Sequence, residues 1–186
     1  MRRIPWWCVP VLVACGGPRV GAPGAATVED LVWGGTDCRR AADCPSGVCT
    51  AGACVGYLGA ATEEARAIIG LALAAAVARG QGEEVRQALA EVLSSTGSDE
   101  FLRGRAADAF RWLPPGLGGD TLAGLAEDPS EPVRFFAARA RHARGDPEAR
   151  ELLRSFLRHP SEAVRMLATR ALATGTEPGD QGPINQ

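Results

Sequence analysis

The chain of 186 residues contains no lysine, so all 20 of its basic residues are arginine. We interpret this as a bias of genome composition rather than as chemistry. Because 22 acidic residues give a net charge of −2, the composition does not indicate nucleic-acid binding, which usually requires a strongly basic surface. Aromatic residues make up only 5% of the chain. Since β-branched and aromatic residues favour strands, the alanine-rich remainder favours close-packed helices over a β-sandwich.

Sequence motifs of common catalytic sites are also missing. The chain contains no Gly-rich phosphate loop, no HExxH and no GxSxG. The only two histidines, His142 and His159, have no cysteine nearby and no recognisable nucleophile–base spacing. We therefore predict a protein that is not an enzyme, with no catalytic residue, no metal ligand and no cofactor.

All six cysteines lie within the first 54 residues. Cys8 and Cys15 are close to the N-terminus, and the other four form a cluster between residues 38 and 54. The C-terminal two-thirds of the chain must therefore fold without cysteine.

Residues 1–14 have the layout of a secretory signal: a charged start, an apolar middle and small residues at the end. The apolar run is too short for a bilayer, which needs about 20 residues. Its end, Leu12-Val13-Ala14-Cys15, resembles the lipobox of bacterial lipoproteins. The resemblance implies cleavage before Cys15, a diacylglycerol on that cysteine, and anchoring to a membrane of the bacterial cell envelope, facing the periplasm or the exterior. An ordinary cleaved signal is the alternative.

Residues 38–54 read CRRAADCPSGVCTAGAC and space their cysteines among turn-forming proline and glycine. Structural zinc sites usually use closer cysteine pairs, often with histidine, and exported proteins meet an oxidising compartment, so we favour two disulfides over zinc. Four cysteines allow three pairings, and spacing does not choose among them. The segment resembles the DCPxGxC…GxC modules of exported bacterial proteins, which favours the interlaced pairs Cys38–Cys49 and Cys44–Cys54. We interpret it as a structural spacer, with a small recognition module as the alternative.

One phrase occurs twice in the C-terminal half. Residues 129–140 read PSEPVRFFAARA and residues 160–171 read PSEAVRMLATRA, with 8 of 12 positions identical at a distance of 31. Residues 98–109, SDEFLRGRAADA, are a third copy. One further step of 31 gives a weaker match through Leu71, Ala75, Ala76 and Ala78. A fixed period of this length is typical of a solenoid, in which each unit buries its apolar face against its neighbours.

The pattern DPSEPVRFFAARA, followed by a second helix, resembles HEAT repeats, above all the short variety also found in phycobilisome lyases. The resemblance covers about residues 62–174 and implies a scaffold for protein–protein interaction. Those lyases bind bilins, but no motif here supports chromophore chemistry. An envelope spacer or assembly factor, and a lyase-like enzyme or enzyme subunit, are the alternative functions.

Apolar periodicity and turn residues predict seven helices, near 62–79, 83–95, 99–113, 119–127, 131–144, 147–158 and 161–174. The predicted fold is all-α: a short right-handed α-solenoid of about seven antiparallel helices after a disulfide-rich segment. The predicted organisation is a signal peptide (1–14), a flexible tether (15–36), a disulfide-rich module (37–56), a helical repeat domain (57–175) and a disordered tail (176–186).

Two sets of arginines are candidate functional residues. Arg103, Arg134 and Arg165 share one repeat position, and we predict a structural ladder in which each pairs with acids such as Asp99, Asp128, Glu131 or Glu162. A second set, Arg150, Arg154 and Arg158, forms a stripe along one helix. That stripe is a candidate binding site for a protein partner with an acidic surface, and a solvated helix face is the alternative.

Overall fold

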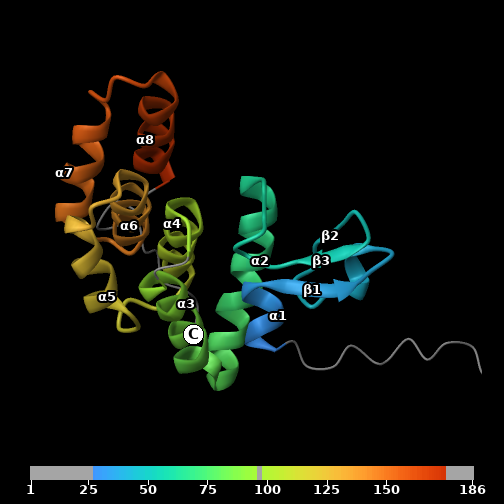
Figure 1. Cartoon of the computed structure of the whole chain (residues 1–186). Coiled ribbons are helices and arrows are strands. Elements are labelled where there is room, and N and C mark those ends of the chain that lie inside the picture. Colours follow the sequence, from blue (N-terminus) through green and yellow to red (C-terminus); the bar gives the residue numbers. More distant parts are fainter. Residues whose placement is uncertain (1–26, 96–97, 175–186) are drawn as a thin grey trace, which may run out of the picture.

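The computed structural model describes residues 27–95 and 98–174. The predicted signal peptide, the candidate lipidation site Cys15 and the predicted tail of residues 176–186 lie outside these ranges. Figure 1 shows a small unit with three strands at one side and a row of helices at the other. No helix in the described ranges is long and apolar enough to cross a membrane.

The N-terminal unit contains helix α1 (Val28–Val32) and strands β1 (Gly34–Asp37), β2 (Cys49–Thr50) and β3 (Ala53–Val55). The strands form an antiparallel sheet in the order β1-β3-β2. Residues 28–36 were predicted to belong to a flexible tether, and this is wrong. The side chains of Thr27 and Asp30 cap α1, and Leu31 and Val32 are fully buried, so burial of two apolar side chains holds this segment in the fold.

The seven predicted helical segments all appear. Their bounds are α2 (Glu63–Ala76), α3 (Gly82–Ser94), α4 (Glu100–Ala109), α5 (Gly119–Gly124), α6 (Glu131–Ala143), α7 (Pro147–Phe156) and α8 (Glu162–Thr174). Three helices, α2, α4 and α5, end three or four residues earlier than predicted because tighter or wider turns follow them. Val77–Gln81 forms a π-helical segment with Gly80 at φ 94°, and Phe110–Trp112 and Leu125–Glu127 are 3-10 turns.

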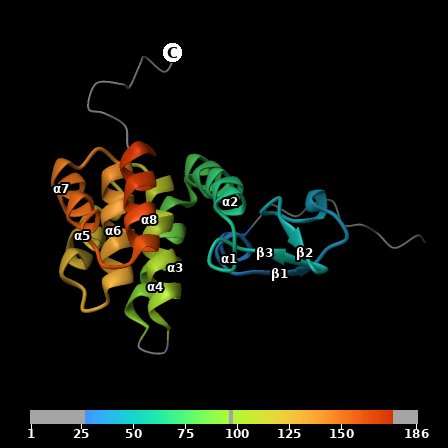
Figure 2. The same cartoon turned by 90° about the horizontal axis from the view of Figure 1, so that it is seen from above.

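The helices are arranged in two layers. Helices α4, α6 and α8 lie side by side, with α5 and α7 on the side away from α2 (Figure 2). In the layer formed by α4, α6 and α8, each helix contacts the helix that precedes it in the chain. Helix α3 contacts α4, α5 contacts α6, and α7 contacts α8. This serial stacking of helix pairs is the predicted solenoid.

The first repeat begins at a different place from the one predicted. Thr62 and Asp99 both accept a hydrogen bond from the backbone three residues on and cap α2 and α4. The sequences TEEAR, DEFLR, SEPVR and SEAVR, starting at residues 62, 99, 130 and 161, are therefore equivalent helix starts. The first step is 37 residues rather than 31, so the predicted match through Leu71 is out of register. The longer step accommodates the π-helical segment Val77–Gln81 between α2 and α3.

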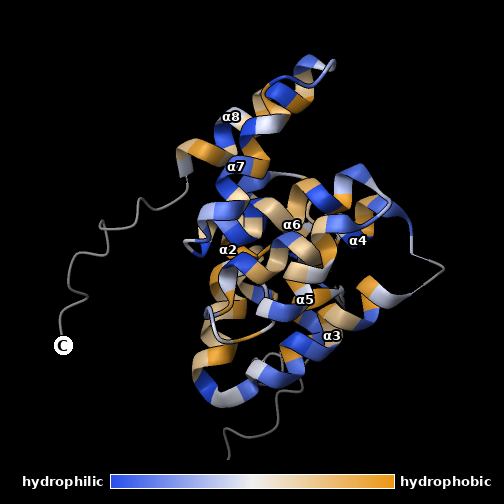
Figure 3. Ribbon diagram, turned by 90° about the vertical axis from the view of Figure 1, so that its left-hand side faces the viewer, coloured by the Kyte–Doolittle hydropathy of each residue, from blue (hydrophilic) through white to orange (hydrophobic). Residues whose placement is uncertain are grey.

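Most of the apolar core is shared between the N-terminal unit and the helices. The larger core cluster combines residues of α1 and the segment 57–60 with residues of α2 to α6. A smaller cluster joins α6, α7 and α8, where the rings of Phe135 and Phe156 pack edge to face at 5.2 Å. Figure 3 shows hydrophobic and hydrophilic residues alternating along the helices, as expected when each helix buries one side. The N-terminal unit therefore closes one end of the solenoid.

Candidate interaction groove

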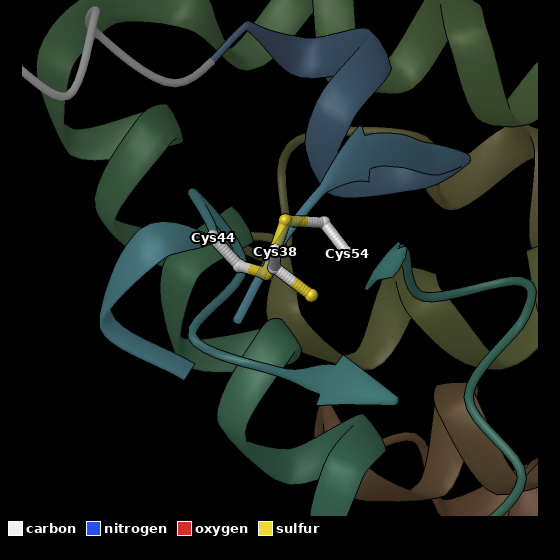
Figure 4. Close-up of side chains that lie close together, drawn as sticks. All are labelled: Cys38, Cys44 and Cys54. Carbon is white, nitrogen blue, oxygen red and sulfur yellow. A yellow bond between two sulfur atoms is a disulfide. The ribbon is translucent and has the colours of Figure 1, made fainter. Parts of the chain in front are cut away.

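The four clustered cysteines form two disulfides, Cys38–Cys49 and Cys44–Cys54. This is the interlaced pairing. The Sγ atoms of Cys38, Cys44 and Cys54 all lie within 4.8 Å of one another, beside the small sheet (Figure 4). Metal ligation requires thiolates, and these sulfurs are joined in disulfides. The four cysteines form a small core of their own, which fits a structural role for this module.

A groove of about 600 Å³ lies between the start of α2 and the helices α4, α6 and α8. Its lining contains five arginines, two acids and several apolar residues. The arginines are Arg66, Arg105, Arg111, Arg139 and Arg170, the acids are Glu63 and Asp108, and the large apolar residues are Phe101, Phe136 and Leu167. We call this surface the arginine groove.

The repeat period places two rows of side chains in the groove. Arg105, Phe136 and Leu167 are spaced by 31 residues, and so are Asp108, Arg139 and Arg170. Each row takes one residue from α4, one from α6 and one from α8. Because the two rows are three residues apart along every helix, they share one helix face. The groove is therefore a direct product of the repeat.

Three arginines form ion pairs with Glu63, which lies at the start of α2. Arg66 lies 3.0 Å from its carboxylate, Arg111 2.6 Å and Arg139 2.8 Å. Burial alone would raise the pKa of the Glu63 carboxyl. The hydrogen bond from Arg111 and the charges of Arg139 and Arg111 outweigh that effect and hold the pKa at about 2. Glu63 therefore stays ionised and neutralises part of the arginine charge.

Asp108 is the buried acid of the groove, with 1% of its surface exposed. The Tyr57 hydroxyl donates a hydrogen bond to Asp108 Oδ2 at 2.7 Å, and Arg139 Nη2 donates one to the same oxygen at 3.1 Å. Arg139 Nε lies 2.8 Å from Oδ1, although its N–H is not aligned for a hydrogen bond. Burial, and then the charge of Asp108, raise the pKa of the Tyr57 hydroxyl, so Tyr57 remains a hydrogen-bond donor at neutral pH.

The arginine groove carries more positive than negative charge. Five arginines against two carboxylates leave a formal charge of +3. Arg105 Nη1 donates to the neutral backbone oxygen of Leu58 at 2.6 Å, so its charge is not compensated by that contact. In the residues that the structure describes, the exposed guanidinium of Arg170 has no carboxylate within ion-pair distance. These two arginines can accept an anionic group from outside.

The three ladder arginines make two kinds of contact. Arg103 pairs with Asp128 of the following repeat and donates to Leu93 O at 3.2 Å. Arg134 and Arg165, for which acidic partners were predicted, donate to backbone oxygens instead. Arg134 Nη1 lies 2.6 Å from Asp128 O, and Arg165 Nη1 lies 2.8 Å from His159 O.

The reason for these backbone contacts is the loop before each helix. Its last carbonyls have no helical partner, and an arginine on the fourth helical residue folds back to satisfy them. Arg66 in α2 does the same, with Nη1 2.9 Å from Ala60 O. In α2, α6 and α8 the repeated arginine therefore fixes the entry of the chain into the helix, whereas Arg103 in α4 forms the predicted pair with an acid of the next repeat.

The predicted binding stripe runs along α7 and into the turn after it, and it lies outside the groove. None of Arg150, Arg154 and Arg158 lines it. Arg154 pairs with Glu151 one turn away, Arg150 is partly buried and Arg158 is exposed. The residues that do line the groove were not selected from the sequence. The signal for Arg139 and Arg170 was present, since both copies of the repeated phrase end in arginine–alanine, but no signal marked Arg105 or Arg111.

Comparison with known proteins agrees with this architecture. No curated protein and no solved structure matches the chain. Residues 120–181, which include α6, α7, α8 and nearly all of α5, match the family model for HEAT repeats. HEAT repeats generally serve as scaffolds for protein interaction. Together with the stacked helices, this match supports a HEAT-repeat protein.

Proposed function

We propose that this protein is an exported, lipid-anchored component of the bacterial cell envelope that holds a protein partner on its helical repeats. In this proposal residues 1–14 are removed, Cys15 carries the lipid, and the residues up to 26 connect the lipid to the folded part. The interlaced disulfides support export, because disulfides persist mainly in oxidising compartments.

The observation that carries the binding role is the arginine groove. It runs over the ends or faces of four helices and has a volume of about 600 Å³. Its two acids are already paired with arginine, and the exposed Arg170 adds positive charge at its surface. An extended partner is held in a groove by hydrogen-bond donors that converge on it and by exposed apolar side chains that it can bury. The arginine groove has both features.

Two measurements test the anchor. The intact mass of the mature protein from membranes should correspond to a chain that begins at Cys15 with a diacylglycerol attached. A Cys15→Ala variant should lose the lipid mass and leave the membrane fraction. A mature chain that begins at another residue, or wild-type protein without added lipid, contradicts the anchor but leaves the binding role standing.

The binding role is tested in intact cells with a photoreactive amino acid at Leu167, which lines the groove, and, as a matched control, at Arg158 in the turn after α7. We expect a discrete cross-linked protein from position 167 and not from position 158. Equal cross-linking at both positions, or none at either, contradicts a partner-binding groove.

A further inference from the structure

We propose that the arginine groove binds an acidic peptide segment that also carries a large apolar side chain. This inference rests on the proposed binding role and names its ligand class. It also moves the acidic-partner site from the stripe on α7 to a surface formed by α2, α4, α6 and α8.

The charge of the groove selects an acidic ligand. Glu63 and Asp108 are both occupied by arginines of the groove itself, so neither is available to attract a basic partner. Within residues 27–95 and 98–174, the hydrogen bond that Arg105 donates goes to the neutral backbone oxygen of Leu58, and Arg170 is exposed. A carboxylate near Arg105 on α4, or near Arg170 on α8, would form charge-assisted, bidentate contacts with that guanidinium group.

The apolar residues select the second feature of the ligand. Phe101 is 62% exposed and Leu167 is 40% exposed, and both line the groove beside the partly buried ring of Phe136. Phe101 precedes Arg105 by one helical turn on α4, and Leu167 precedes Arg170 by one turn on α8. Both helices therefore present an apolar and a cationic side chain as neighbours, and a ligand that satisfies both must alternate acidic and large apolar groups.

The same features argue against a purely anionic surface or polymer. A phosphate backbone or an anionic membrane would satisfy the arginines but would leave Phe101 and Leu167 in contact with polar groups or water. The exposed apolar area next to the charge therefore favours a peptide.

The proposal is tested with the full-length protein and a fluorescein-labelled peptide in which aspartate and glutamate alternate with leucine and phenylalanine. Fluorescence anisotropy measures the binding. Two comparison peptides replace the acids by their amides, or the apolar residues by serine. Polyphosphate and vesicles with anionic lipid are offered as competitors. We expect binding of the first peptide, at least about tenfold weaker binding of both comparison peptides, and no displacement by either competitor.

Matched variants locate the binding. Arg170→Glu and Phe101→Ala should each weaken the binding of the acidic–apolar peptide at least about fivefold, because each removes one of the paired features. Both side chains are exposed, so these variants should fold. Arg158→Glu makes the same charge reversal as Arg170→Glu, but in the turn after α7, and should change the affinity less than about twofold.

The outcomes separate the two proposals. Equal weakening by Arg170→Glu and Arg158→Glu, or binding that is insensitive to Phe101→Ala, overturns the proposed ligand. Displacement by polyphosphate or by anionic vesicles assigns the groove to a phosphate-bearing ligand and also overturns it. If the cross-linked partner at position 167 persists while the acidic peptide fails to bind, the binding role stands and only the ligand class is wrong.

Discussion

The hydroxyl of Tyr57 donates a 2.7 Å hydrogen bond to Asp108 Oδ2, which joins two residues that are 51 positions apart. Tyr57 follows the disulfide-rich module and Asp108 lies in α4. Both are buried, with exposed fractions of 0% and 1%. Trp112 Nε1 donates in turn to the Tyr57 hydroxyl at 3.2 Å. This contact therefore joins the N-terminal unit to the wall of the arginine groove.

Tyr57→Phe should destabilise the protein by about 1–3 kcal/mol, because it leaves the buried Asp108 carboxylate with one donor fewer. Urea denaturation followed by circular dichroism measures the change. Ser94→Ala is the control, since the Ser94 hydroxyl bonds Glu91 O on an exposed helix end and its loss should cost less than about 0.5 kcal/mol. An equal effect of both substitutions contradicts the buried connection.

The acid stability of the protein should depend on Glu63. Its folded pKa of about 2 lies below the ordinary value of 4.5, so the ionised form stabilises the fold. That stabilisation is fully present above pH 4.5 and is lost as the pH falls from there towards 2. Because Glu63 is half-exposed and its charge is screened by solvent, we expect its ionised carboxylate to contribute about 1 kcal/mol to the free energy of unfolding.

The measurement is the free energy of unfolding between pH 5 and pH 2 for the wild type and for Glu63→Gln. The variant should be less stable at pH 5 and should lose less stability on acidification. Glu64→Gln, at an exposed position beside it, serves as the control and should follow the wild-type curve. Parallel curves for Glu63→Gln and the wild type are the contrary result.

Gly70→Ala should disturb the packing of Trp112. A Cβ atom at position 70 would lie 2.1 Å from the Trp112 ring, so the ring must move and its hydrogen bond to Tyr57 must lengthen. We expect a loss of about 1–3 kcal/mol together with altered tryptophan fluorescence. Gly124→Ala is the matched control, because in the described part of the chain no atom beyond its chain neighbours and its own helix backbone lies within 4 Å of its added Cβ, and a helical glycine-to-alanine change is neutral or mildly stabilising. A fully stable Gly70→Ala variant contradicts the close contact.

Reduction of the two disulfides should loosen the N-terminal unit before the repeats. Each bond closes a short loop, with sequence separations of 11 and 10, and should contribute about 2–4 kcal/mol to that unit. Hydrogen exchange should rise first in residues 34–55, while helices α6 to α8, which have a separate core, retain protection. The double variant Cys38→Ser/Cys49→Ser should reproduce part of this change. Uniform exchange along the whole chain is the outcome that contradicts it.

The helical part of the fold could be predicted because its signals are local. Glycine, proline and capping residues mark the helix ends, and the 31-residue period marks the stacking unit. The errors came where a local pattern was incomplete. Residues 28–36 were assigned to the tether together with the residues before them, but burial of Leu31 and Val32 against other segments is a tertiary effect. The first repeat was placed out of register because alanine matches alanine at almost any offset in α2.

The sequence by itself determined the order of the helices and which residues share a face, because hydrophobic period and capping chemistry act within a few residues of each other. Only the tertiary structure decided which charges meet. Glu63 lies 48 positions from Arg111 and 76 from Arg139, and no local rule connects them. Whether an arginine is satisfied or free to bind a partner depends on such distant contacts, so the interaction groove emerged only when the helices were stacked.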